Sequence, residues 1–193
     1  MQQLVIASNN KGKLSEISKM IKNIELLTLG DIGYTKEIPE PFHTFEENAL
    51  AKASTVNQFC KKNVFAEDSG LCVVALGDVP GVDSAHFSGE RDDEKNLQLV
   101  LKQLEGVEDR QAYYKAVICL IWGDEVYYFE GTCNGSILTY KKGTGGFGYD
   151  PIFVPDGYDT TFAELPITVK NTISHRAKAV LKMIDFLKAK LTE

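Results

Sequence analysis

The sequence predicts an α/β fold with a mixed β-sheet. Strand-like apolar runs alternate with helix-like stripes along the first half of the chain, as in βα units. Two longer β-rich runs then meet at Gly123-Asp124, which is typical of an antiparallel hairpin. The 193 residues fit one domain or two closely joined lobes, and no repeat or linker divides them. We therefore interpret residues 1–193 as a single domain.

The first elements are expected to be a strand, a helix and a second strand. Residues 3–7 and 24–29 are the two apolar runs. Between them, apolar residues recur at the spacing of one helix face, at Leu14, Ile17, Met20 and Ile21. Thr44 followed by Glu47 is a capping-box signature, so a helix should begin there. Its apolar stripe consists of Leu50, Ala53, Val56 and Cys60.

The middle of the chain shows two short strand patterns. They cover residues 64–67 and 71–76, with a turn expected at Ser69-Gly70 between them. Residues 81–91 read as a loop. A helix should follow from Asp92 or Asp93, with its apolar face at Leu97, Val100, Leu101 and Leu104.

The last third begins with the predicted hairpin. Its first run, residues 112–122, would span about 35 Å at roughly 3.3 Å per residue, so we expect an elongated, strongly twisted sheet. After a glycine-rich segment, Ser174 is expected to cap the final helix. That helix carries its apolar stripe at Ala177, Val180, Leu181, Ile184 and Leu187.

Composition restricts the classes of partner. The chain is 44% hydrophobic and 25% charged, as expected for a soluble globular protein. Its net charge of -6 argues against a nucleic-acid surface, so a polyanion site must be a pocket where a few cations or a metal converge. The N-terminus has no signal-peptide pattern, and no apolar run approaches the roughly 20 residues of a membrane helix.

The cysteines predict reduced thiols. Cys60, Cys72, Cys119 and Cys133 form no C-x-x-C pair, and three of them lie in apolar runs. This usage fits a cytoplasmic protein with structural thiols.

The first candidate site is the loop that follows the first strand. It stands where a helix begins, so unpaired backbone N–H groups and the helix dipole favour an anion there. A P-loop is excluded because Ala7 and Leu14 occupy positions that need glycine and serine or threonine. The alternative is an Asn N-cap with two solvated lysines. The loop residues are Ser8, Asn9, Asn10, Lys11, Gly12 and Lys13.

The second candidate site is the acidic pair Glu67-Asp68. Adjacent strand residues point to opposite faces, so one carboxylate can face a site while the other faces elsewhere. A carboxylate at a strand end suits a magnesium ligand or a general base. The alternative is a turn in which the aspartate only bonds to the backbone.

Two further segments suggest a planar ligand. In "GTGGFGYDP" the pattern Gly143, Gly145, Gly148 lacks a following helix, which excludes a dinucleotide loop and leaves a flexible loop presenting an aromatic ring, or a surface turn. In "KNTISHRAK", His175 and Arg176 place cations in the first turn of a helix, against its dipole. Such groups can serve as donors to a ligand.

Together the motifs resemble the inosine triphosphate pyrophosphatase family. They are "SNNKGK", "TFEENALAKA", "EDSGL", "PGVDSAHFSG", "GTGGFGYDPIF" and "SHRAKA", in family order and over nearly the whole chain. The resemblance implies two α/β lobes around a deep cleft, a homodimer and a Mg²⁺ requirement. It implies hydrolysis of ITP, dITP or XTP to the monophosphate and pyrophosphate in the cytoplasm, which keeps such bases out of DNA and RNA.

The resemblance also implies residue roles at the phosphate end. Residues 8–13, chiefly Ser8, Asn10 and Lys13, would hold the triphosphate, and Lys52 would add charge. Asp68 would be the general base and, with Glu40, a metal ligand. Catalysis would then consist mostly of positioning and electrostatics.

At the base end, the resemblance implies a stacking ring and several polar groups. Donors there would pair with O6 of hypoxanthine and oppose the amino group of adenine. The expected substrate contacts are Ser69, Phe147, Gly148, Tyr149, Asp150, Lys170, His175 and Arg176. The alternatives are a Maf-like pyrophosphatase acting on pyrimidine or modified nucleotides, and a nucleotide-binding regulator without catalysis.

Overall fold

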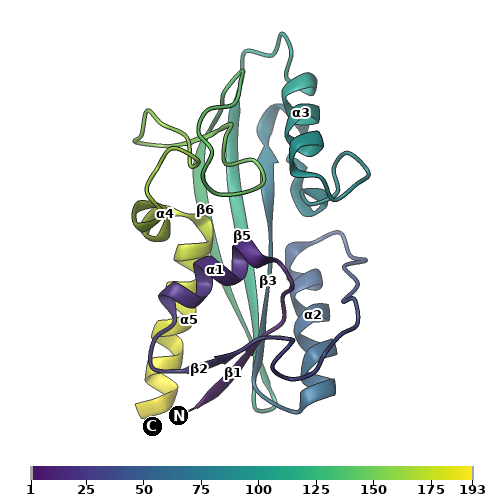
Figure 1. The fold of residues 1–193 in the computed structure, drawn as a ribbon, viewed down its shortest axis with the longest axis vertical. Coiled ribbons are helices and arrows are strands. Elements are labelled where there is room, and N and C mark those ends of the chain that lie inside the picture. Colours follow the sequence, from purple (N-terminus) through teal and green to yellow (C-terminus); the bar gives the residue numbers. More distant parts are fainter. Residues whose placement is uncertain (1, 193) are drawn as a thin grey trace. The chain divides into compact units, whose positions relative to one another are not determined.

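The α/β class is confirmed in a computed structural model, which describes residues 2–192 (Figure 1). The strands are β1 (Gln3–Ile6), β2 (Glu25–Leu27), β3 (Val64–Val73), β4 (Val79–Pro80), β5 (Gln111–Trp122), β6 (Glu125–Ile137) and β7 (Phe153–Pro155). The α-helices are α1 (Lys11–Met20), α2 (Phe45–Cys60), α3 (Asp93–Gln103), α4 (Ile167–Ile173) and α5 (His175–Thr192). Short 3-10 turns are η1 (Val74–Leu76) and η2 (Gly81–Asp83).

The sheet is mixed, as predicted. Its strand order is β2-β1-β3-β5-β6-β7, with β4 paired to β3. Strand β1 runs parallel to both β2 and β3, whereas β3–β4 and β6–β7 are antiparallel. The long hairpin of β5 and β6 turns at Gly123, whose φ of 61° is in the left-handed region that glycine adopts readily.

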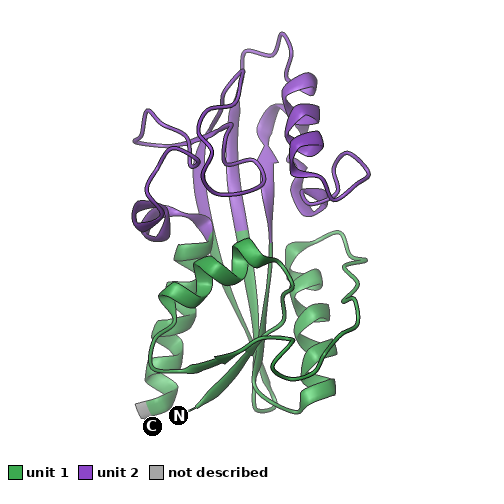
Figure 2. Ribbon diagram, viewed as in Figure 1, with its two compact units in different colours: residues 1–68, 116–131, 176–193 green, residues 69–115, 132–175 purple. Residues whose placement is uncertain are grey.

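The chain divides into two compact units (Figure 2). Unit 1 comprises residues 1–68, 116–131 and 176–193, and unit 2 comprises residues 69–115 and 132–175. Strands β3, β5 and β6 each contribute residues to both units.

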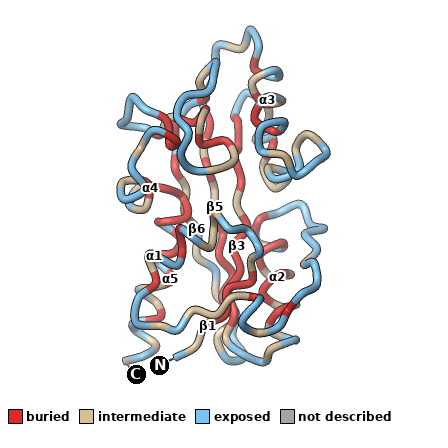
Figure 3. The backbone as a smooth tube through the Cα atoms, viewed as in Figure 1, coloured by how far each residue is buried: buried red, intermediate tan, exposed pale blue. Residues whose placement is uncertain are grey.

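Unit 1 has a hydrophobic core on each side of its strands. Leu4 and Ile6 of β1 pack with apolar residues of α1 and α5, while Val5 and Ala7 pack with those of α2. This is the side-to-side alternation that a strand imposes on consecutive residues. With residues buried on both sides, most of β1 and β3 is coloured as buried along the tube in Figure 3.

Unit 2 has its own core beneath α3. Leu97, Val100 and Leu104 of α3 pack against β-strand and loop residues. Among these, Tyr114 meets Phe153 edge-on with ring centroids 4.8 Å apart. Such aromatic contacts add to the hydrophobic burial that stabilises a small core.

The predicted turn at Ser69-Gly70 is wrong. Strand β3 continues through both residues without a break. The glycine is required by close packing instead, because a Cβ on Gly70 would lie 2.0 Å from the carbonyl oxygen of Gly81. Glycine inside a strand commonly marks such an approach of another backbone segment.

The sequence patterns also missed short elements. Strands β4 and β7 were not predicted, and neither was α4, which is seven residues long. Helix α4 begins with Ile167, Thr168 and Val169, which are β-branched and therefore poor helix formers. Thr44 is confirmed as the N-cap of α2: its hydroxyl accepts from Glu47 N at 3.2 Å and donates to the Glu47 carboxylate at 2.8 Å, in place of the reciprocal backbone bond of a full capping box.

Three of the four cysteines are buried, as their apolar surroundings predicted: Cys72, Cys119 and Cys133. Within the described residues, none of the helices has the length and apolarity needed to cross a membrane.

Candidate active site

The loop between β1 and α1 is held by its own side chains. The Asn10 carbonyl oxygen caps α1 by accepting from Lys13 N at 3.0 Å, and the Ser8 hydroxyl accepts from Asn10 N at 3.2 Å. The Asn N-cap of the alternative interpretation is therefore present, but only one of its two lysines, Lys11, is exposed. Asn9 and Lys11 are exposed beside it, and Gly12 is half-buried. The first N–H groups of a helix have no intrahelical acceptor, so this turn can donate to an anion.

Lys13 points from α1 toward a buried ionic cluster in unit 1. Its ammonium lies 3.5 Å from Oε1 of Glu67, and its side chain is only 14% exposed. Arg176 donates from Nε and Nη2 to the two oxygens of the same carboxylate, at 2.7 and 2.9 Å. From Nη1 it also donates to Glu16 at 2.5 Å. The cluster thus joins α1, β3 and α5 through buried charges.

The surroundings of Lys13 in this cluster shift the pKa of its ammonium group. Burial lowers the pKa of Lys13, because the charged form loses solvation, and the nearby Glu67 carboxylate opposes that change by raising it. Arg176 lies in the first turn of α5, where the helix dipole disfavours a cation. Its hydrogen bonds to the Glu67 and Glu16 carboxylates offset this unfavourable interaction.

A second charged group surrounds Asp68. Lys52 of α2 donates to Oδ1 of Asp68 at 2.9 Å and to Oε1 of Glu40 at 2.8 Å. Asn48, one turn earlier on the same helix, donates to Oδ2 of Asp68 at 3.3 Å. Asn48 also exchanges hydrogen bonds with the backbone of Phe42, so it ties the loop before α2 to the carboxylate.

Burial and ion pairing act on Asp68 in opposite directions. Burial raises the pKa of Asp68, and the Lys52 and Lys13 ammonium groups lower it, so that the net direction is upward. For Lys52, burial alone would lower the pKa, but the Asp68 and Glu40 carboxylates outweigh it and raise the pKa. Asp68 is therefore a buried carboxylate with a raised proton affinity, as a general base requires.

Glu67 and Asp68 face opposite sides of β3, as the sequence predicted. Glu67 contacts residues of α1 and α5, and Asp68 contacts residues of α2. Glu67, Glu16 and Asn48 were not among the predicted site residues. Asn48 could have been found from its spacing, because it stands four residues before Lys52 on one helix face. The pairing of Glu16 with Arg176 joins residues 160 positions apart and has no local signal.

The donor set around Asp68 fits a magnesium ion. Oxygens of Asp68 and Glu40 both lie within 2.9 Å of the Lys52 ammonium, so they converge on one small region. No group of three or more His, Cys, Asp or Glu residues with metal-site spacing is found within the described residues. Mg²⁺ typically uses one or two carboxylates and takes its other ligands from substrate phosphates and water.

The glycine-rich loop of unit 2 is held by hydrogen bonds to the Asp150 carboxylate. The Asp150 carboxylate accepts from Phe147 N at 2.9 Å and from the Lys170 ammonium at 2.6 Å. That ammonium lies 5.0 Å from the centre of the Phe147 ring. A Cβ on Gly146 would lie 2.0 Å from the same carboxylate, so glycine permits this closure. The loop is thus an ordered turn that holds the Phe147 ring against a cation.

The other predicted base-end residues of unit 2 have structural contacts of their own. Tyr149 is buried and its hydroxyl donates to Ser84 O at 2.7 Å, and Gly148 N donates to Asp93 at 2.8 Å. The His175 ring is stacked on Tyr114 with centroids 4.6 Å apart. Ser69 is half-buried within β3.

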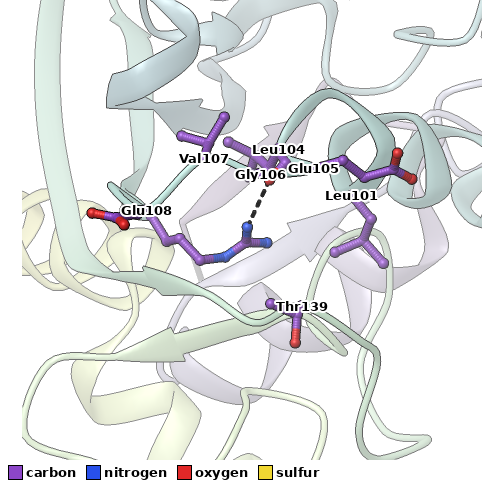
Figure 4. Close-up of a pocket in the computed structure, with 8 residues that line it drawn as sticks. Leu101, Leu104, Glu105, Gly106, Val107, Glu108 and Thr139 are labelled. Carbon is purple, nitrogen blue, oxygen red and sulfur yellow. Dashed lines mark hydrogen bonds between the residues drawn. The ribbon is translucent and has the colours of Figure 1, made fainter.

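One pocket in unit 2 contains none of the predicted site residues (Figure 4). Its volume is about 440 Å³, and Leu101, Leu104 and Val107 supply much of its apolar lining. The Arg110 guanidinium in its lining has a structural role, because it donates hydrogen bonds to the carbonyl oxygens of Leu104, Ile137 and Leu138. We assign this pocket no function.

The α/β fold, the capped turn and the buried pairs of lysines and carboxylates form a site suited to a phosphate-bearing ligand. The chain belongs to the Ham1 family, whose model matches residues 4–186. This membership confirms the resemblance inferred from the motifs.

Individual relatives agree with the family match. The chain is 47% identical over 189 residues to the dITP/XTP pyrophosphatase of Flavobacterium johnsoniae, covering 97% of this chain and 98% of the relative. Among solved structures, the Staphylococcus aureus Ham1 protein is 37% identical, with a TM-score of 0.89, covering 98% of this chain and 100% of the other. A HAM1 protein from Coxiella burnetii is 34% identical, with a TM-score of 0.90 and the same coverage of both chains.

Proposed function

We propose that the protein hydrolyses non-standard purine nucleoside triphosphates, namely ITP, dITP and XTP, to the monophosphate and pyrophosphate. The observation that carries the proposal is the pairing of a buried carboxylate, Asp68, with Lys52 and Glu40 beside the capped turn at residues 8–13. The name of the Flavobacterium relative, a dITP/XTP pyrophosphatase, supports the choice of substrate.

In the proposed reaction, Asp68 takes the proton from the water that attacks the α-phosphorus. Its raised pKa favours this step, and Asn48 fixes its orientation by holding Oδ2. Lys13, Lys52, Ser8 and the N–H groups at the start of α1 bind the phosphates and stabilise the charge that develops on the pyrophosphate leaving group.

Mg²⁺ would be held by Asp68 and Glu40 together with phosphate oxygens. When bound, it neutralises phosphoryl charge. Lys52 pairs with both carboxylates. Its ammonium is attached to a flexible stem and can turn toward a phosphate while remaining charged.

At the base end, we propose that Phe147 stacks on the purine. Gly148, Tyr149 and Asp150 would shape that contact, and Ser69, Lys170, His175 and Arg176 would supply polar groups. The Lys170 ammonium beside the ring and the Asp150 bond to the loop support this role, because both fix the position of Phe147. We further propose a cytoplasmic homodimer, which sedimentation of the purified protein would test.

A substrate panel with separate detection of pyrophosphate and orthophosphate tests the function. We expect pyrophosphate from ITP, dITP and XTP with Mg²⁺, and much slower turnover of ATP, GTP and pyrimidine triphosphates. Release of orthophosphate alone, a preference for ATP or for pyrimidines, or binding without turnover would each reject the proposal.

Asp68→Asn tests the base. The amide keeps the size of the side chain but cannot take a proton at neutral pH, so turnover should fall by about a hundredfold or more. Nucleotide binding, measured by calorimetry, should be largely retained. Asp185→Asn is a matched control, because it makes the same change at an exposed carboxylate of α5 that accepts from Lys188 at 3.0 Å. An unchanged rate in Asp68→Asn would remove Asp68 from this role.

A further inference from the structure

Two cations compete for one buried carboxylate in unit 1. Oε1 of Glu67 accepts from Arg176 Nη2 at 2.9 Å, and the Lys13 ammonium lies 3.5 Å from the same oxygen. Arg176 also occupies Oε2 at 2.7 Å, so the guanidinium binds the carboxylate through both oxygens. This two-point geometry is the strongest that a carboxylate and a single cation can form.

The two lysines of the site differ in how their partners hold them. Lys52 donates to two carboxylates at 2.8 and 2.9 Å. Lys13 has an ion pair at 3.5 Å, and no hydrogen bond from its ammonium is found in residues 2–192. Lys13 therefore keeps its position through charge attraction while its N–H groups remain able to donate to another anion.

From this contrast we infer that Arg176 is a positioning residue for the phosphate site. By holding both oxygens of Glu67, it keeps that carboxylate from capturing Lys13, so the lysine can donate to phosphate. Glu16 supports the arrangement by holding Nη1 of Arg176 at 2.5 Å. The inference rests on the proposed function and gives Arg176 a role beyond contact with a base.

Loss of Arg176 should let the Glu67 carboxylate bond directly to Lys13. In Arg176→Met, Glu67 remains buried and the Lys13 ammonium still lies 3.5 Å from its Oε1, so the two should form a direct, hydrogen-bonded pair. The lysine is then withdrawn from phosphate. Replacing Glu67 by glutamine in the same chain removes the competing charge, and it also restores the balance of positive and negative groups in the cluster.

Inorganic tripolyphosphate is the decisive probe, because it has phosphates and no base. We would measure its binding by titration calorimetry at one fixed Mg²⁺ concentration. Arg176→Met should weaken binding by about tenfold or more, the loss expected for one hydrogen bond to a charged group. Arg176→Met with Glu67→Gln should recover a large part of that loss, and Arg176→Lys, which cannot span both oxygens, should fall between wild type and Arg176→Met.

A matched control comes from unit 2. Arg110→Met also removes a guanidinium that is bonded to its neighbours, and it should leave tripolyphosphate binding unchanged. Melting curves would verify that each variant is folded. If Arg176→Met alone does not fold, the charge-balanced double variant and Arg176→Lys still test the inference.

The outcomes separate the inference from its premise. If wild-type protein releases no pyrophosphate from ITP, the proposed function fails. If the wild type is active but Arg176→Met and Arg176→Lys bind tripolyphosphate normally and lose only nucleotide binding, Arg176 acts on the base alone and the inference is rejected. If the double variant binds tripolyphosphate no more tightly than Arg176→Met, the inference is also rejected, because Glu67 would then not be what withdraws Lys13 from phosphate.

Discussion

Replacement of Lys52 by methionine should make the protein depend on magnesium for stability. In the wild type, the Lys52 ammonium balances Asp68 and Glu40, whose side chains are 5% and 32% exposed. Methionine keeps the length of the side chain and removes the charge. It removes the ammonium that bonds to both carboxylates, and a divalent ion can then replace the missing charge.

The magnitude follows from burial. Removing one partner of a buried ion pair costs about 3–5 kcal/mol of unfolding free energy. Because water screens the partly exposed Glu40, we expect the lower end, about 3 kcal/mol, and it comes mainly from Asp68. For a chain of this size, each kcal/mol shifts the melting temperature by about 2–4 °C, so Lys52→Met should melt about 6–12 °C lower.

Thermal melting with and without MgCl₂ measures the effect. Magnesium should return at least half of the lost melting temperature in Lys52→Met and should change the wild type much less. Lys141→Met is the matched control, because it removes an exposed ion pair with Glu94 and should shift melting by no more than about 2 °C. A variant that melts like the wild type, or one that is equally unstable with magnesium, would refute the convergence of these carboxylates on one cation site.

Two other predictions concern the glycine-rich loop of unit 2 and the buried thiols. Gly146→Ala places a Cβ 2.0 Å from Asp150 at a φ of 71°, so it should lower the melting temperature by about 2–8 °C and weaken ITP but not tripolyphosphate binding. Gly157→Ala, at a similar φ of 83° with open space, separates backbone strain from the clash; equal effects on ITP binding would contradict the Asp150 contact. Burial raises the pKa of Cys72 and Cys119 to about 11, so at pH 8 iodoacetamide should label the half-buried Cys60 before either of them by mass spectrometry. Thiols of the unfolded chain ionise near pH 8.5, so the stability that burial of the two neutral thiols contributes is complete below that pH and is lost as the pH rises toward 11. Melting temperatures that do not fall between pH 9 and 11 would contradict this pH dependence.

The predictable part of the fold was the part with strong periodicity. Thr44, Asn10 and the hairpin at Gly123 carry local signals, because caps and turns are decided by a few neighbouring residues. Gly70 was misread because the reason for a glycine was another backbone segment, at Gly81, which no local pattern reveals.

The same distinction applies to the candidate site. The alternation of Glu67 and Asp68 followed from strand geometry alone. Which cation each carboxylate meets depended on how helices pack on β3, and that is a tertiary property. The sequence indicated Arg176 as a possible donor to a ligand, but it could not show that Glu67 accepts from its guanidinium.

Because Glu67 and Asp68 point in opposite directions, strand alignment decides which of them takes the position of the proposed base. Ile6 of β1 is paired with Phe65 of β3, and that pairing fixes which of the two acids meets α2. A slip of one residue would exchange the faces to which they point, so that the aspartate would face the side of α1 and α5 and the glutamate the side of α2. The hydrophobic residues that set this alignment thereby decide which carboxylate stands at the position of the proposed base beside Lys52.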